Sequence, residues 1–512
     1  MDRSHTSRTQ ATELLFEIEV DPPQKGSRQS AKAVYVQLKA AILDGRLTAG
    51  AKLPPTRSAG LIFGVSRNTA GNVYEKLEHE GFVITRHGSG SYVAPTLPAA
   101  PICPVRRQAQ GLGQHRINAF WRCSDVAASI NYWRDSARAP IQPPKIPQID
   151  FRPGIVDSTL FPFDVFRRVS ATQLRGLAKR PVSHRGLEGN QGNYRLRQAV
   201  SRHLAVTRAV VCQSDDIIVT SGAQQAFDLL ARVLVIPNET VVAFEDPGYP
   251  PMRVNFAAAG AKLVPVGVDE EGLILEQLPK DVGIICVTPS HQFPLGITMS
   301  QRRRNALIEY ARKHGAVIIE DDYDGEFRYE GAPVEALRNA EAADVVFYVG
   351  TFSKSMLPGI RLGFVVAPDW LTRTLITAKN CMDWHCSTPV QRAVAGFIAD
   401  GHLSRHVLKM RGLYKQRRNL ILEVLRGEFG AWLAPIPSLY GMHVAVTAAA
   451  SVNLEAVADE LLRHNVRIHT LSRYFFGAET KRGFILGFGA ADPAQIRSGF
   501  SVLLKTLERR RP

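Results

Sequence analysis

Residues 350–363 read Gly-Thr-Phe-Ser-Lys-Ser-Met-Leu-Pro-Gly-Ile-Arg-Leu-Gly, and this run sets the expectation for most of the chain. Two hydroxyl residues, Thr351 and Ser353, precede Lys354, and Arg361 follows it. Hydroxyl and guanidinium groups bind phosphate, and a lysine amine forms an imine with an aldehyde. The pattern therefore predicts a site for a phosphorylated aldehyde cofactor, with Lys354 as the residue that bonds to it.

A group of carboxylates ends the run Val317-Ile-Ile-Glu-Asp-Asp-Tyr-Asp324. The run predicts a buried strand whose C-terminal end carries the acids, which is where α/β sheets place ligands. Pyridoxal phosphate accepts electrons only while its ring nitrogen is protonated, and an adjacent carboxylate keeps it so. We assign this role to Asp321 rather than Asp322. A strand end with solvated acids is the alternative, and Lys354 with its neighbours disfavours it.

Two further runs fit the same cofactor. Thr220-Ser-Gly-Ala-Gln-Gln-Ala226 predicts a glycine turn entering a helix, so that backbone N–H groups near Ala223 and Gln224 can hold a phosphate. Glu245-Asp-Pro-Gly-Tyr-Pro250 predicts a turn after a strand, with Tyr249 as an aromatic lid on the cofactor ring. A Pro-Gly pair also serves simple turns, which is the alternative for this second run.

Short apolar runs alternate with helical stretches from about residue 148 to the end of the chain. Such alternation predicts an α/β fold with a mostly parallel sheet, here the cofactor-binding domain over residues 148–512. Residues 95–147 are rich in Pro and Ala and predict a linker, whose later half, with Trp121 and Trp133, joins the next domain. The predicted strands cover residues 217–220, 240–245, 284–288, 316–321 and 345–349.

The N-terminal segment, residues 23–94, has a different pattern. Helical spacing and turn residues predict helices over about 30–44, 56–63 and 67–79, followed by a β-hairpin within 82–93. Helix, helix-turn-helix and hairpin in this order predict a winged helix-turn-helix domain that binds double-stranded DNA.

Individual residues of this segment are candidates for DNA contacts. Residues at the start of the third helix would reach base edges, Arg57 would face phosphate, and the hairpin tip would act as a wing. A small helical dimerisation domain with a solvated basic face is the alternative. The predicted DNA-binding residues are Arg57, Ser66, which also caps the third helix, Arg67, Asn68, Thr69, Arg86, His87 and Gly88.

The composition predicts a cytoplasmic protein that binds a polyanion. The 512 residues carry a net charge of +16, and the apolar runs fall short of the roughly 18 residues that a membrane span needs. The polar start, residues 1–10, does not resemble a secretory signal. Six cysteines without C-x-x-C spacing predict neither disulfides nor zinc, and Cys381-Met-Asp-Trp-His-Cys386 indicates incidental thiols rather than a metal site.

The N-terminal segment resembles the GntR family of winged-helix repressors, and the large domain resembles the fold-type I aminotransferases. The whole chain is therefore identified as similar to the MocR-type regulators, which join these two parts. The matching N-terminal residues are 41–47, 50–54, 64–69, 74–77, 80–81 and 88–90. Further matching residues of the large domain are 189–192, 196–197, 288–296, 410–418 and 441–443.

The resemblance implies a role for each matching residue and an assembly for the protein. It makes Lys354 the internal aldimine lysine, pairs Asp321 with the ring nitrogen and places Tyr323 near the phenolic oxygen of the cofactor. It assigns Gln224, Thr351, Ser353 and Arg361 to the phosphate. It also implies a homodimer, which would meet repeated half-sites on an operator.

Three departures from the families bear on function. Ala59-Gly60 stands where a better helix former is usual, which predicts a looser second helix. Phe293 stands where aminotransferases carry an Asn that bonds the phenolic oxygen, and Ile485 stands where they carry an arginine for the substrate carboxylate. Arg473 and Arg482 are nearby candidates to replace that arginine. Both losses favour sensing over turnover.

We therefore expect a transcriptional regulator that senses pyridoxal phosphate, or an amino compound that displaces Lys354 from it by aldimine exchange. Residual transamination chemistry is compatible with this reading, but steady turnover is not expected. One alternative is an active aminotransferase with an accessory or vestigial winged helix. Another is a DNA-binding module whose C-terminal domain is empty.

Overall fold

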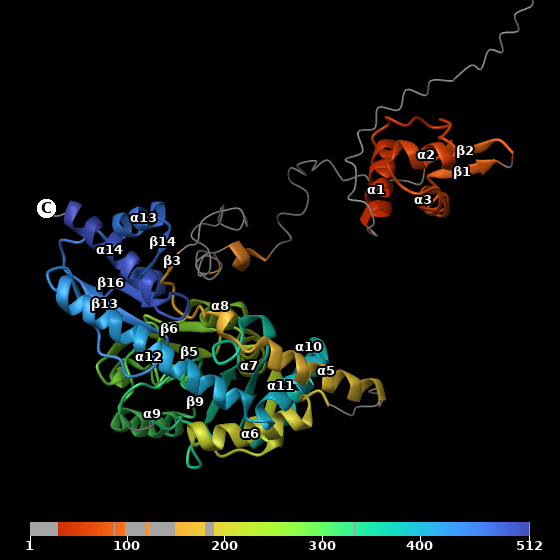
Figure 1. Cartoon of the computed structure of the whole chain (residues 1–512). Helices are drawn as coiled ribbons and strands as arrows, with labels where there is room; N and C mark the ends of the chain where they lie inside the picture. Colours follow the sequence, from red (N-terminus) through yellow and green to blue (C-terminus); the bar gives the residue numbers. More distant parts are fainter. Residues whose placement is uncertain are drawn as a thin grey trace, which may run out of the picture. The chain divides into compact units, whose positions relative to one another are not determined.

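The computed structural model describes residues 29–86, 88–97, 118–122, 126, 149–179, 189–331 and 334–510. The chain forms two compact units, residues 1–116 and residues 117–512 (Figure 1). Their division falls inside the predicted linker, most of which, including Trp133, lies outside the described residues. Trp121 lies in a short 3-10 helix, Ala119–Arg122, with its side chain exposed.

The N-terminal unit contains the predicted winged helix, with helices α1 (Gln29–Leu43), α2 (Thr56–Ile62) and α3 (Arg67–His79). Strands β1 (Val83–Arg86) and β2 (Gly90–Val93) pair antiparallel and form the wing. The apolar positions that predicted the helices meet in one core. Its members include Val34, Leu38, Ile42, Phe63, Val73, Tyr74 and Leu77.

Helix α2 spans Thr56–Ile62 and includes Ala59 and Gly60; the predicted loosening of this helix stays a prediction. Gly60 is buried, and a Cβ added to it would lie 2.9 Å from the carbonyl oxygen of Val65. The glycine therefore lets α2 pack directly against the turn that leads into α3. The backbone N–H of Val65 also donates to the carbonyl oxygen of Gly60, at 2.9 Å. Close packing at this turn explains a residue that helix propensity alone disfavours.

The large unit is built on an eight-stranded sheet in the order β4-β11-β10-β9-β8-β5-β6-β7. The pairs from β10 to β6 are parallel, whereas β4, β11 and β7 join antiparallel. This arrangement confirms the predicted mostly parallel α/β fold. The strands are β4 (Ile217–Thr220), β5 (Val241–Asp246), β6 (Lys262–Asp269), β7 (Gly272–Leu273), β8 (Val282–Val287), β9 (Val317–Asp322), β10 (Val346–Thr351) and β11 (Gly363–Val366).

Helices cover both faces of this sheet, which is why its strands are apolar on both sides. Ile218 packs with α7 (Ala223–Leu234), α8 (Pro250–Ala258) and α10 (Asp369–Asp383) on one face. Its neighbours Ile217 and Val219 point to the other face. That face carries α6 (Tyr194–Arg208), α9 (Gln301–His314) and α11 (Thr388–Ala399), with α5 (Phe163–Lys179) packed on α11.

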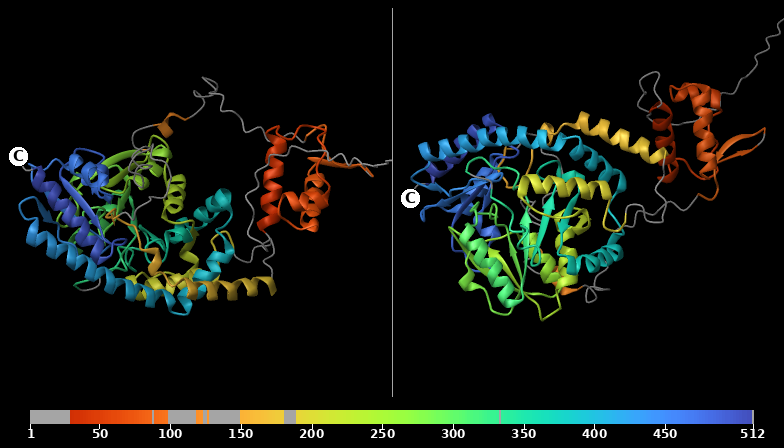
Figure 2. Two further views of the ribbon diagram at one scale, coloured as in Figure 1. Left: turned by 45° about the horizontal axis from the view of Figure 1, so that its top comes forward. Right: turned by 90° about the horizontal axis from the view of Figure 1, so that it is seen from below.

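A smaller C-terminal sheet follows the long helix α12 (His402–Glu428), which runs beside it in Figure 2. It is antiparallel, in the order β12-β13-β16-β15. Its strands are β12 (Leu433–Pro435), β13 (His443–Ala448), β15 (His469–Thr470) and β16 (Gly483–Gly487), with helices α13 (Leu454–Arg463) and α14 (Pro493–Arg509).

The first strand of the large unit pairs with a strand of this C-terminal part. Strand β3 (Ile149–Asp150) pairs parallel with β14 (Val466–Arg467), so the segment after β3 begins next to the smaller sheet. Among the described residues, no helix combines the length and apolarity that crossing a membrane would require.

Candidate functional site

A cavity of about 520 Å³ lies at the C-terminal ends of the parallel strands. Every cofactor-binding residue that the sequence predicts lines it. Those residues are Lys354, Asp321, Tyr323, Tyr249, Ala223, Gln224, Thr351, Ser353 and Arg361. The remaining lining residues are Gly154, Ile155, Val156, Phe293 and Pro358. The segment 154–156 follows β3, and no motif of the sequence singled it out.

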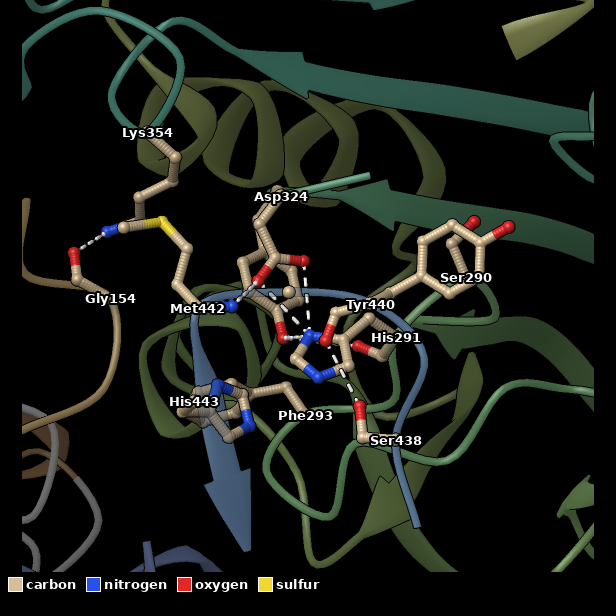
Figure 3. Close-up of polar contacts among 12 residues, drawn as sticks. Gly154, Ser290, His291, Phe293, Asp324, Lys354, Ser438, Tyr440, Met442 and His443 are labelled. Atoms are coloured by element: carbon tan, nitrogen blue, oxygen red, sulfur yellow. Dashed lines mark hydrogen bonds and ion pairs between the residues drawn. The ribbon is translucent and has the colours of Figure 1, made fainter. Parts of the chain in front are cut away.

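Lys354 lies in the turn after β10, and its Nζ donates a hydrogen bond to the carbonyl oxygen of Gly154 (Figure 3). Loss of water around the amine lowers its pKa from 10.5 to about 8, against the opposing pull of the Asp324 and Asp321 carboxylates. At neutral pH a larger share of the amine is then unprotonated. The unprotonated amine is the form that attacks an aldehyde.

Asp321 is buried at the end of β9, and its Oδ1 has no hydrogen-bond partner. Burial raises the pKa of this carboxyl well above its ordinary value, and the Asp322 and Asp324 carboxylates raise it further. A cationic ring nitrogen beside Oδ1 would supply both the missing donor and the missing charge. The residues present therefore fit pyridoxal phosphate.

Asp322 is engaged elsewhere, and it does not line the cavity. Its Oδ2 forms an ion pair with Arg208 Nε at 2.6 Å and accepts a hydrogen bond from the Tyr348 hydroxyl at 2.6 Å. This placement favours Asp321, the residue chosen from the sequence, over its neighbour.

The residues predicted to hold the phosphate meet at the N-terminus of α7. Gly222 caps the helix with φ +82°, and a Cβ added there would lie 3.2 Å from the Arg361 guanidinium. Arg361 donates to the carbonyl oxygen of Ser221 at 3.1 Å. Helix N-termini and guanidinium groups both favour phosphate, so the cradle has the composition that the sequence predicted. The hydroxyl of Thr351 accepts from the Ser353 backbone N–H at 3.1 Å, which orders the adjoining turn.

The two departures in the large domain meet in one apolar cluster. The Phe293 ring makes edge contacts with Tyr249, Tyr323 and Tyr474, at centroid distances of 5.7, 5.7 and 5.2 Å. Ile485, in β16, is fully buried in the same cluster. Polar groups expected at these positions in aminotransferases are thus replaced by a continuous apolar wall.

Neither candidate arginine replaces the missing one. Arg482 donates to the carbonyl oxygens of Ala450 and Val452, at 3.2 and 3.0 Å. Arg473 is exposed in the 3-10 helix Leu471–Tyr474. Neither side chain lines the cavity.

A buried polar network contacts Tyr323, and Figure 3 labels its members His291, Asp324, Met442 and His443. The Tyr323 hydroxyl lies 2.8 Å from His291 Nδ1, which also contacts Asp324 Oδ2 at 3.1 Å. Asp324 in turn accepts from the Met442 backbone N–H at 3.1 Å. His443 packs on the His291 ring and donates from Nε2 to the carbonyl oxygen of Pro294 at 2.9 Å. Burial lowers the pKa of His443 well below its ordinary value, so the ring is neutral.

Sequence reasoning assigned no role to this network. His291 and His443 lie inside the runs 288–296 and 441–443, which were used only to support a resemblance. The ligand atoms of His291, Asp324 and His443 lie within 4.8 Å of one another, the composition of a possible metal site that the sequence did not predict. The two histidines inside these runs were the feature of the sequence that could have indicated this network.

The predicted DNA-binding residues lie on the recognition helix, on α2 and on the wing. Ser66 caps α3, and its Oγ accepts from the Thr69 backbone N–H at 3.0 Å. Arg67 and Asn68 are exposed in the first turn of α3, and Arg57 is exposed on α2. Arg86 ends β1 over the Tyr92 ring, and Gly88 follows in the wing turn with φ +73°. His87 lies outside the described residues.

Family models match both units. The model for aminotransferase class I and II matches residues 162–486, and the model for bacterial regulatory proteins of the gntR family matches residues 30–93. The structure of kynurenine aminotransferase from Pyrococcus horikoshii is similar to the large unit, with a TM-score of 0.65 and 26% identity. That similarity covers 72% of this chain and 92% of the other.

Relatives with both parts match nearly the whole chain. The chain is 34% identical over 477 residues to the "Probable rhizopine catabolism regulatory protein MocR" of Rhizobium meliloti, covering 92% of each protein. It is 30% identical over 461 residues to the "HTH-type pyridoxine biosynthesis transcriptional regulator PdxR" of Corynebacterium glutamicum. That alignment covers 90% of this chain and 92% of the relative.

Proposed function

Since this chain belongs to the HTH-type transcriptional regulators in which a gntR-family domain precedes a class I and II aminotransferase domain, we propose that its large unit is a sensor built on pyridoxal 5'-phosphate. Lys354 holds the cofactor covalently, and the signal is the cofactor itself or an amino compound that takes the place of Lys354. One observation carries the proposal: Asp321, whose buried Oδ1 has no hydrogen-bond partner, lines the same cavity as Lys354.

Different residues of the cavity hold different parts of the cofactor. Asp321 pairs with the ring nitrogen, Tyr249 covers the ring, and Tyr323 lies beside the phenolic oxygen. The α7 N-terminus with Gln224, Thr351, Ser353 and Arg361 takes the phosphate. Pyridoxal phosphate, when bound, supplies an aldehyde carbon that exchanges one amine for another.

Sensing rather than turnover is supported by the apolar wall. Phe293 cannot hydrogen-bond the phenolic oxygen, and Ile485 cannot hold a substrate carboxylate. Departure of the Lys354 amine from the cofactor changes the charge and contacts of the turn after β10. A ligand with different affinity for the two states then biases the DNA-binding state of the protein.

The N-terminal unit supplies the output. The first turn of α3, with Arg67, Asn68 and Thr69, reads base edges from the position that Ser66 fixes. Arg57 holds phosphate, and Arg86, His87 and Gly88 form the wing tip. A homodimer brings two such units to repeated half-sites of an operator, in keeping with the closed symmetry usual for homo-oligomers.

The cofactor part is tested by adding pyridoxal phosphate to the purified full chain and recording the visible absorbance of the protein-bound imine. Lys354→Ala is expected to abolish the band, whereas Lys409→Ala, on the exposed side of α12, leaves it unchanged. A band of unchanged intensity in Lys354→Ala contradicts the proposal. Turnover of an amino donor and a keto acid at ordinary transaminase rates supports the enzyme alternative instead.

The DNA part is tested by footprinting on the region upstream of the chain's own gene and its neighbours. Arg67→Ala is expected to remove the footprint and to leave the visible band intact. Arg373→Ala removes the same charge from the exposed side of α10 and serves as the matched control. An unchanged footprint with Arg67→Ala refutes the assignment of the recognition helix.

A further inference from the structure

The end of the cavity away from the phosphate cradle is apolar, and its chemistry restricts what can enter. Resting on the proposed function above, we infer that the amino compound is a primary amine without a carboxylate next to its amino group. Phe293 lines this end, and Ile485, Tyr474 and Leu471 pack with it in one apolar cluster without lining the cavity themselves. Amines on an apolar or neutral carbon frame match the wall, whereas α-amino acids bring a negative charge to it.

The charged groups that line the cavity are few, and each has another task. Among the described lining residues they are Asp321, Lys354 and Arg361. Arg361 lies against Gly222 and donates to the Ser221 carbonyl oxygen, at the end reserved for phosphate. Lys354 is the amine that the ligand replaces. No cation of the lining then remains for a carboxylate of the ligand.

Two arginines near Tyr474, Arg152 and Arg253, are already engaged, whereas Arg473 is exposed. Arg152 forms an ion pair with Asp150 at 2.6 Å. Arg253 donates to the carbonyl oxygen of Tyr474 at 3.1 Å, and its guanidinium lies over the Phe476 ring. Arg482 is bound to two carbonyl oxygens in the pocket beside α13. Turning Arg152 or Arg253 toward the cavity would break contacts that these two residues make in a largely buried setting, whereas Arg482 is exposed.

Ile485 is held where it is by the sheet. It pairs with Ala445 of β13 and with His469 of β15, and its side chain is fully buried. The position therefore cannot yield to a carboxylate by moving aside. A carboxylate brought against this wall would lose its water without gaining a counter-charge, a cost that lowers affinity by roughly a hundredfold or more.

The inference is tested with the cofactor-loaded full chain and pairs of compounds that differ only in the carboxylate. One pair is 2-phenylethylamine and L-phenylalanine, and another is cyclohexylamine and 1-aminocyclohexane-1-carboxylate. The measured quantity is the concentration that half-converts the visible band of the Lys354 imine. We expect half-conversion by each amine at a concentration at least about a hundredfold lower than by its amino acid.

A ligand-side control separates charge from bulk without changing the protein. L-phenylalanine methyl ester is larger than the free acid by one methyl group but lacks the negative charge, so it is expected to act near the amine and far from the free acid. On the protein side, Ile485→Arg is expected to lower the half-conversion concentration for L-phenylalanine. Because Ile485 is fully buried, the ester measurement stands even if this variant does not fold.

The outcomes distinguish failure of the proposed cofactor site from failure of the inferred ligand class. A band that is absent, or present in Lys354→Ala, overturns the proposed cofactor site itself. A normal band with amino acids acting at equal or lower concentration than the matched amines overturns the inference alone. A normal band that neither amines nor amino acids convert also overturns it, since the cavity would then take no amine.

Discussion

Replacing Glu245 with glutamine is expected to reduce the loss of stability that the large unit suffers as pH rises. Glu245 is buried in β5, and its Oε2 accepts hydrogen bonds from the Thr288 backbone N–H and hydroxyl, at 3.0 and 2.6 Å. Its Oε1 is buried without a partner. Burial raises the pKa of this carboxyl from 4.5 to about 7.

The direction in which the free energy of unfolding changes with pH follows from proton binding. Between pH 4.5 and 7 the folded unit keeps a proton on Glu245 that the unfolded chain has lost, so stability falls as pH rises through this window. A shift of this size corresponds to roughly 3 kcal/mol, most of which is lost between pH 5 and pH 8. Glutamine does not titrate, and its amide oxygen can still accept from Thr288. The variant is therefore expected to gain about 2 to 3 kcal/mol relative to the wild type over that pH range.

Urea unfolding followed by tryptophan fluorescence measures this difference in the full chain. All five tryptophans lie between residues 117 and 512, so the signal reports the large unit alone. Free energies of unfolding are measured for both proteins at pH 5 and pH 8. Glu276→Gln, at an exposed position, is the matched control and should differ from the wild type equally at both pH values. If Glu245→Gln also differs from the wild type in free energy of unfolding by the same amount at pH 5 and pH 8, the reasoning is refuted.

Three further predictions concern the cofactor site and the reading helix. The rate at which the apoprotein takes up pyridoxal phosphate should rise with pH to a half-maximum near pH 8, because the Lys354 amine has a pKa of about 8; a rate still rising steeply at pH 10 contradicts this. Gly222→Ala should weaken cofactor binding by roughly tenfold in an absorbance titration, since φ +82° and the Arg361 guanidinium 3.2 Å away disfavour a Cβ. Ser66→Ala should lower the opening free energy of α3 by about 1 kcal/mol in hydrogen exchange; unchanged protection would show that the cap contributes nothing.

The sequence was sufficient for features that depend on local pattern. Five of the eight strands of the large sheet, β4, β5, β8, β9 and β10, were predicted because they read as continuous apolar runs, as in Val317–Asp322, whereas β6, β7 and β11 were not predicted. The cavity residues were predicted because each follows such a strand or begins the next helix. In a parallel sheet these ends meet at one edge, so residues as distant as Tyr249 and Lys354 line one cavity.

Features that depend on contacts between distant segments were beyond the sequence. The helix propensity of glycine predicts a looser α2 and does not reveal the close approach of the Val65 carbonyl oxygen to Gly60. Arg482 was a candidate to bind a substrate carboxylate, but its side chain donates to the carbonyl oxygens of Ala450 and Val452. The contact of His291 with Tyr323 joins two motifs that are separated along the chain, and neither motif alone predicts it.

The joining of Phe293 and Ile485 in one cluster agrees with the proposed site, in which Lys354 holds a cofactor without the polar groups that usually recognise the substrate. A lone Phe293 beside an arginine would leave a buried cation facing an aromatic wall, and a lone Ile485 beside an asparagine would leave a buried amide short of partners. Replacing both polar groups removes both penalties, and the aromatic contacts of Phe293 with Tyr323 and Tyr474 fill the space. Binding energy for a ligand must then come from exchange at Lys354 and from apolar contact. A site of this kind favours amines that bring little charge of their own.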